Sequence, residues 1–175
     1  AEELGFEVRL NHRTSPLKDE EWADLLVGVD ALLTTWDSPI LDDVVLSRNS
    51  TLRIVGHVGG SVAGIVSPEL YERGVRVCTA NSLMARTVAE WGLMMTLVGL
   101  RRLLGYARFR AADPGPLWEE RQTSLPPSDA VIGIWGYGDV ARRLIQLLRP
   151  LAPGEIIVSD DFLTADTASA EGIQK

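Results

Sequence analysis

A glycine-rich turn between a strand-like and a helix-like segment constrains this chain more than any other feature. Val131–Trp135 is an apolar run of the kind that forms a β-strand, and Gly136–Ala141 follows it with the pattern Gly-x-Gly-x-x-Ala. Residues 141–148 then place apolar side chains at helical spacing. A strand, a glycine turn and a helix in this order are typical of a dinucleotide-binding unit. An ordinary strand–turn–helix that happens to contain two glycines is the alternative.

Each small residue of the turn has a chemical reason to be there. A nucleotide pyrophosphate needs backbone N–H donors and the positive end of a helix dipole at close range. Gly136 permits the tight turn, Gly138 lets the backbone approach the phosphates, and Ala141 lets the helix pack close to the strand. The predicted cofactor-binding segment is therefore Gly136, Tyr137, Gly138, Asp139 and Val140.

An acidic residue at the end of the next strand supports the same interpretation. A dinucleotide unit places an acid about 20 residues after the turn, where it binds the ribose hydroxyls. Asp160 stands at that distance, directly after the strand-like run 156–158. Asp161 beside it adds negative charge, which disfavours the extra phosphate of NADP and favours NAD. Asp139, in contrast, is a poor neighbour for a phosphate.

Composition limits the classes of partner. Apolar residues make up 46% of the 175 residues, which is enough for a sizeable core in one domain or two small ones. The net charge of −7 argues against a nucleic-acid or anionic-membrane surface. The single Cys78 allows no internal disulfide and no cysteine-based metal cluster, so no metal is expected. The acidic start predicts no signal peptide, and the run 91–100 is too short to span a bilayer. These features favour a cytoplasmic protein.

Strand-like and helix-like segments alternate along the chain. Runs typical of strands occur at 6–10, 31–35, 52–55 and 75–78. Helical patterns follow Ser15-Pro16, cover 68–73 with Gly74 as the C-terminal cap, and extend over 87–104. Residues 113–116 and 123–128 have the composition of breaks or linkers. Strands separated by helices predict parallel sheets in an α/β fold.

Four blocks of sequence resemble the NAD-dependent D-isomer-specific 2-hydroxyacid dehydrogenases. Residues 52–65 are similar to the family's substrate-carboxylate loop, and 72–77 to its usual entry into a strand. Residues 87–90 head a long apolar helix that ends in two arginines, as the family's interdomain helix does. The glycine turn with Asp160 is the fourth block, so the resemblance covers essentially the whole chain in unbroken order.

The resemblance implies two flavodoxin- or Rossmann-like domains with parallel sheets, the second of them truncated. Residues 1–84 would form most of the substrate (catalytic) domain, without its first strand and its C-terminal return. Residues 85–175 would form the interdomain helix and the first half of the NAD domain, stopping after its second strand. The chain is therefore expected to be incomplete, unstable and inactive by itself. In the intact protein the family's homodimer is expected.

The resemblance also implies hydride transfer between NAD and a small 2-hydroxy or 2-oxo acid. The family's catalytic His, its acidic partner and the substrate-binding Arg would all follow residue 175, so this chain holds no catalytic residue. Thr87 and Val88 would line the nicotinamide side of the cofactor cleft. The substrate would contact Gly59, Gly60, Ser61 and Trp36, although a large aromatic residue at such a place is more typical of a structural corner.

Departures from the family pattern leave other functions open. Ser61 replaces a glycine of the carboxylate loop, and Ala63 and Val66 replace its two acids. Met84 replaces an Asn, and Asp139 a frequent Arg. His12, His57 and Glu90 are expected to have packing, surface or structural roles rather than catalytic ones. A non-catalytic NAD-binding regulatory or assembly module, and an inactive truncated relative, therefore remain as alternatives.

Overall fold

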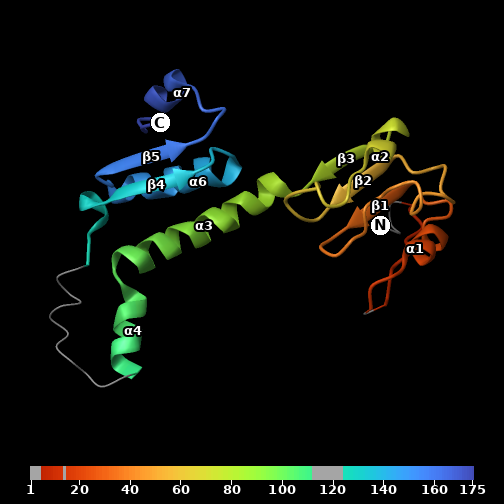
Figure 1. Cartoon of the computed structure of the whole chain (residues 1–175), viewed down its shortest axis with the longest axis horizontal. Coiled ribbons are helices and arrows are strands. Elements are labelled where there is room, and N and C mark those ends of the chain that lie inside the picture. Colours follow the sequence, from red (N-terminus) through yellow and green to blue (C-terminus); the bar gives the residue numbers. More distant parts are fainter. Residues whose placement is uncertain (1–4, 14, 112–123) are drawn as a thin grey trace. The chain divides into compact units, whose positions relative to one another are not determined.

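The computed structural model describes residues 5–13, 15–111 and 124–175, and the chain divides into two compact units, Ala1–Ala80 and Asn81–Lys175. Each unit holds one small parallel sheet (Figure 1). The division follows Ala80, while the resemblance implied a boundary after Met84; the intervening residues form the first turn of a long helix. The predicted break at 113–116 lies outside the described residues.

The first unit is built on three parallel strands in the order β1-β2-β3, as the alternating pattern predicted. They are β1 (Ala31–Thr34), β2 (Ile54–His57) and β3 (Arg76–Thr79). Leu32 and Val77 flank the fully buried Val55 in register, on the face that α1 and α2 side chains help to cover. Leu33, on the opposite face, is 79% exposed, so the apolar strand β1 is covered on one face only.

Two predictions for the start of this unit are wrong. Residues 6–10 form no strand, because no described strand pairs with them, and Phe6, Val8 and Leu10 remain exposed. The first helix, α1 (Asp19–Leu25), begins after Lys18 and not at Ser15-Pro16. The Glu21 carboxylate accepts a hydrogen bond from the Lys18 backbone N–H at 2.9 Å, which fixes the start of the helix there.

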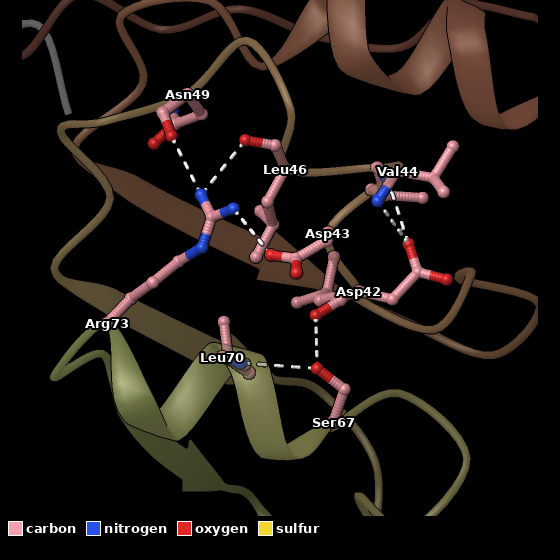
Figure 2. Close-up of polar contacts among 10 residues, drawn as sticks. Asp42, Asp43, Val44, Leu46, Asn49, Ser67, Leu70 and Arg73 are labelled. Atoms are coloured by element: carbon pink, nitrogen blue, oxygen red, sulfur yellow. Dashed lines mark hydrogen bonds and ion pairs between the residues drawn. The ribbon is translucent and has the colours of Figure 1, made fainter.

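A polar network holds the connection from β1 to β2 against α2 (Pro68–Glu72) (Figure 2). Arg73 donates to the carbonyls of Leu46 and Asn49, each at 3.0 Å, and to the Asp43 carboxylate at 2.8 Å. Ser67 caps α2 by accepting from the Leu70 N–H, and donates to the Leu41 carbonyl. Gly74 follows the helix with φ +72°, the left-handed conformation expected of a C-terminal glycine cap.

The second unit is built around the parallel pair β4 (Val131–Trp135) and β5 (Glu155–Ser159). The connecting helix α6 (Asp139–Leu148) buries Ala141, Ile145 and Leu148, the apolar positions at helical spacing. Together with residues of both strands and of α7 (Ala165–Ala170), Ile145 and Leu148 form this unit's core. The strand–turn–helix–strand order predicted from the sequence is confirmed.

The chain does not stop after the second strand of this unit. Gln174 forms a parallel bridge with Ile157 of β5. Its N–H donates to the Ile156 carbonyl at 2.9 Å, and its carbonyl accepts from the Val158 N–H at 2.7 Å. The bridge is isolated, so the sheet of this unit has the two strands β4 and β5, as the resemblance implied, with Gln174 bonded to β5.

The long apolar helix begins earlier than predicted and is interrupted. It runs as α3 (Asn81–Leu100), and α4 (Leu103–Ala111) follows after Arg102, whose φ of +51° ends the first helix. Small residues let α3 pack closely on α6: Ala85 and Ala89 are buried, and Gly92 lies against Leu144.

By length and composition, α3 is the one helix of the described residues able to cross a membrane, with a mean hydropathy of 1.2. Only 11% of that stretch is buried inside the structure. Its packing on α6 nevertheless makes it part of the second unit.

Candidate functional site

The glycine turn joins the carboxyl end of β4 to the start of α6 (Figure 1). Gly136 has φ +93°, a conformation that L side chains rarely adopt, so the residue at this corner has to be glycine. Its N–H donates to the Ser159 carbonyl at 2.8 Å, which ties the turn to the end of β5. At Gly138 the backbone is ordinary, and an added Cβ would meet no atom within 4 Å. Open space therefore lies over Gly138.

Asp160 organises this turn through its carboxylate. One oxygen accepts the Tyr137 backbone N–H at 2.8 Å, and the other accepts those of Phe162 and Leu163 at 2.8 and 3.1 Å. These bonds, that of Tyr137 first, lower the pKa of the Asp160 carboxyl below its ordinary value. A carboxylate has about four acceptor positions, so three bonds leave one for a ribose hydroxyl.

The second unit is expected to lose stability in acid through Asp160. Because its pKa is lower in the folded chain, Asp160 contributes stability above its unfolded pKa of about 3.9, and that contribution is lost as pH falls through the lower, folded value. Asp160→Asn should therefore destabilise the chain at pH 6 and make much less difference near pH 2. Thermal unfolding across this range tests it, with Asp161→Asn as control. If the difference in thermal stability between wild type and Asp160→Asn were as large at pH 2 as at pH 6, the ionised Asp160 carboxylate would not be the group that stabilises the unit.

The N-terminus of α6 fits an anion. Gly138 is its N-cap, and no side chain caps the helix. The first N–H groups of an α-helix have no partner inside it, and here those of Asp139, Val140 and Ala141 adjoin the open space over Gly138. The free N–H groups and the open space over Gly138 fit a pyrophosphate. The unused acceptor position of Asp160 fits a ribose hydroxyl. The exposed Asp139 carboxylate, in the first turn of α6, opposes a phosphate at this place.

Sequence reasoning passed over a residue beside this turn. The Arg142 guanidinium lies over the Tyr137 ring, 5.0 Å from its centroid. A basic residue in the first turn of a helix that faces an anion is the signal that would have identified it. Thr87 and Val88, predicted to line the nicotinamide side, are exposed on α3. No described contact joins them to the glycine turn, so that role stays a prediction.

In the first unit, the residues predicted to bind substrate follow the carboxyl ends of β1 and β2. His57 ends β2, is buried, and pairs its Nδ1 with the Thr34 hydroxyl at the end of β1 at 3.0 Å. The Gly59 backbone packs against the imidazole so closely that an added Cβ would lie 2.2 Å from Nε2. His57 thus packs under the turn rather than lying on the surface. Sequence reasoning missed Thr34, a polar residue at the end of an apolar strand.

Gly59 is expected to tolerate no side chain. In Gly59→Ala the new methyl group would collide with a ring that Thr34 and the surrounding core hold in place, and overpacking of this kind costs about 1–3 kcal/mol. Gly64→Ala is the matched control, because a Cβ there meets nothing within 4 Å. Urea unfolding of both variants measures the difference. Equal stability of the two would show that the turn moves freely relative to His57.

The other predicted substrate residues lie around this turn. Gly60 and Ser61 follow Gly59, and within the described residues their backbone N–H groups make no hydrogen bond. Trp36 lies after β1, is 69% exposed, and precedes Asp37, whose φ is +68°. The Val58 N–H donates to the Thr34 carbonyl at 2.8 Å, which brings the segments after β1 and β2 together. The free N–H groups of Gly60 and Ser61 and the exposed indole of Trp36 therefore follow the carboxyl ends of the strands of this sheet.

Comparison by sequence identifies no relative. No family model matches the chain, and no curated protein matches it either.

Comparison by structure finds dehydrogenases. A phosphoglycerate oxidoreductase from Rhizobium etli is 23% identical, with a TM-score of 0.66 over 90% of this chain and 50% of its own. An NAD-binding putative D-isomer-specific 2-hydroxyacid dehydrogenase from Polaromonas is 18% identical, with a TM-score of 0.66 over 91% and 50%. An NAD-dependent formate dehydrogenase from Staphylococcus aureus, solved with NAD, is 18% identical, with a TM-score of 0.63 over 82% and 43%.

These similarities confirm the predicted α/β fold with parallel sheets and the resemblance to this group of dehydrogenases at the level of the fold. The chain spans about half the length of the solved structures it matches.

Proposed function

We propose that this chain is part of an NAD-dependent oxidoreductase that transfers a hydride between the cofactor and a small 2-hydroxy or 2-oxo acid. The observation that carries the proposal is the glycine turn tied to Asp160, beside an uncapped helix N-terminus with open space over Gly138. The fold shared with known dehydrogenases supports it. When bound, NAD supplies the group that accepts or delivers the hydride.

We assign residues to the pyrophosphate, a ribose and the nicotinamide side of the cofactor. The backbone N–H groups of Gly138, Asp139 and Val140 would bind the pyrophosphate, and the spare acceptor of Asp160 would bind the ribose. Gly136 and Tyr137 shape the turn that presents them. Thr87 and Val88 would line the nicotinamide side, while Gly60 and Ser61 would bind the substrate carboxylate through their N–H groups beside Gly59 and Trp36.

The general acid/base, its acidic partner and the substrate-binding Arg are proposed to lie outside these 175 residues. A longer protein that includes them should oxidise NADH with one or more 2-oxo acids, while the 175 residues alone should show no turnover. Spectrophotometric assay at 340 nm with a panel of 2-oxo acids tests both expectations. Turnover by the 175 residues would contradict this assignment of roles.

A non-catalytic NAD-binding module is the second candidate. It is favoured by Ala63 and Val66, which stand where the resembled carboxylate loop has acids. A longer protein that binds NADH yet turns over no 2-oxo acid would establish it in place of the enzyme.

We further propose a cytoplasmic homodimer. Trp91 and Met94 of α3 are 59% and 49% exposed, although they belong to a helix whose other face packs on α6. Apolar surface of this kind is typical of subunit contacts. Sedimentation equilibrium should give twice the mass of one chain, and a monomer at micromolar concentration would contradict the proposal.

A further inference from the structure

The glycine turn of the second unit is surrounded by negative charge. Asp139 lies in the first turn of α6, Asp160 contacts the turn, and Asp161 is exposed next to it. A pyrophosphate brings two more negative charges to this place. The partial positive charge of a helix N-terminus, about half a unit, does not balance them. A cationic side chain next to the turn would therefore favour a dinucleotide at this place.

Arg142 is placed to supply it. Its backbone N–H donates to the Gly138 carbonyl at 3.1 Å, so it lies one helical turn after the N-cap. Helical side chains tilt toward the N-terminus, and the guanidinium lies over the ring of Tyr137, the residue between the two glycines. The side chain is exposed and makes no ion pair within the described residues. Its five N–H donors can therefore reach a phosphate while the guanidinium stays next to the turn.

The other arginines of α6 and its C-terminal end are engaged elsewhere. Arg143 donates to the Ser82 carbonyl at 3.4 Å, on α3. Arg149 pairs with the Glu171 carboxylate beyond α7 and with its carbonyl. Of the three, Arg142 alone is adjacent to the turn, and its stacking on Tyr137 already orders part of the long side chain. Ordering it beforehand reduces the entropy cost of using it for binding.

We propose that Arg142 is a phosphate-binding residue of the dinucleotide site and that it offsets the repulsion from Asp139. The inference rests on the proposed function, because it requires a nucleotide at the glycine turn. Arg142 would be a side-chain donor in a phosphate site otherwise made of backbone N–H groups. Its stacking on Tyr137 would then serve ligand binding.

Titration of the chain with ADP and with adenosine tests the proposal, with binding followed by amide chemical shifts. Arg142→Gln should weaken ADP binding about fivefold to tenfold, as expected for one charge-assisted bond at an exposed site. It should leave adenosine binding unchanged and reduce the salt dependence of ADP binding. Arg142→Lys should restore much of the ADP affinity, since it retains the charge. Arg143→Gln, the matched control, should change little.

A second variant gives an independent measure. Asp139→Asn removes the opposing charge and should tighten ADP binding severalfold without affecting adenosine. Equal loss of ADP and adenosine binding in Arg142→Gln would show that Arg142 only shapes the turn through Tyr137, and would overturn the proposal. Unchanged ADP affinity in that variant would also overturn it. If neither ligand shifts the amides of 136–141 in the wild-type chain, the proposed nucleotide site itself fails, and the inference fails with it.

Discussion

Asn49→Leu is expected to destabilise the first unit by about 3–5 kcal/mol. The buried Asn49 side chain makes four backbone hydrogen bonds: it donates to the carbonyls of Leu26 and Val29 and accepts the N–H groups of Thr51 and Leu52. Leucine has a similar volume but removes all four bonds. The Leu26 and Val29 carbonyls keep a second donor each, whereas the N–H groups of Thr51 and of the buried Leu52 lose their partner. Urea unfolding measures the loss, and hydrogen exchange of Val55 in β2 assigns it to this unit.

Ser50→Ala is the control for that experiment, because Ser50 is the exposed neighbour of Asn49. Its stability should stay within about 0.5 kcal/mol of wild type, as is usual for surface changes. If Asn49→Leu is as stable as Ser50→Ala, the four bonds of the Asn49 side chain do not hold the connection between β1 and β2 in place. The bond from Arg73 to the Asn49 carbonyl in Figure 2 is a backbone contact that this variant retains.

Gly138→Ala is expected to separate binding from folding. Its Cβ meets no protein atom within 4 Å and its backbone conformation suits any residue, so stability should be nearly unchanged. The same methyl group would occupy the space through which a pyrophosphate approaches the backbone, so NAD affinity should fall about tenfold or more, equivalent to ~1.4 kcal/mol. Calorimetric titration with NAD, paired with thermal unfolding, measures both.

Gly133→Ala provides the comparison, because it also adds a methyl group that meets no atom within 4 Å, but on β4, before the turn. It should leave NAD affinity unchanged. NAD binding by Gly138→Ala at wild-type strength would place the phosphates away from the turn.

The second unit was more predictable from the sequence than the first. The run Val131–Trp135, the two glycines and the helical spacing that follows are local signals, and each formed the expected element. Asp160 was identified by its distance from the turn, and the structure adds that its carboxylate binds the Tyr137 N–H. The bridge from Gln174 to β5 was not predicted, because it is made by backbone groups alone, which leave no side-chain pattern.

Two elements were predicted wrongly, the strand at 6–10 and the continuous helix over 87–104. In both, the local sequence pattern did not show what the rest of the fold imposes. Residues 6–10 alternate like a strand, but a strand needs a neighbour to bond with, and the structure provides none among the described residues. The long helix was predicted as continuous through Arg102, whose left-handed backbone is not encoded by a glycine or proline.

The candidate site shows the same limit. The carboxylate loop was found by resemblance, but the burial of His57 under it depends on Thr34, which lies 23 positions earlier in the chain. Arg142 could have been noticed from its place in the first turn of the helix, but that its guanidinium lies over Tyr137 is known only from the structure. Contacts between side chains from different elements are set by packing and cannot be deduced from spacing.

Whether the glycine turn binds the phosphates of NAD can be measured by titrating the isotope-labelled chain with NAD. Amide shifts recorded by NMR should move most at Gly136–Ala141 and at Asp160, saturably, with little change at Gly154 and Gly172 at the opposite end of the strands. Saturating NAD that leaves the amides of 136–141 unmoved, or that shifts those around Gly154 instead, would contradict the account.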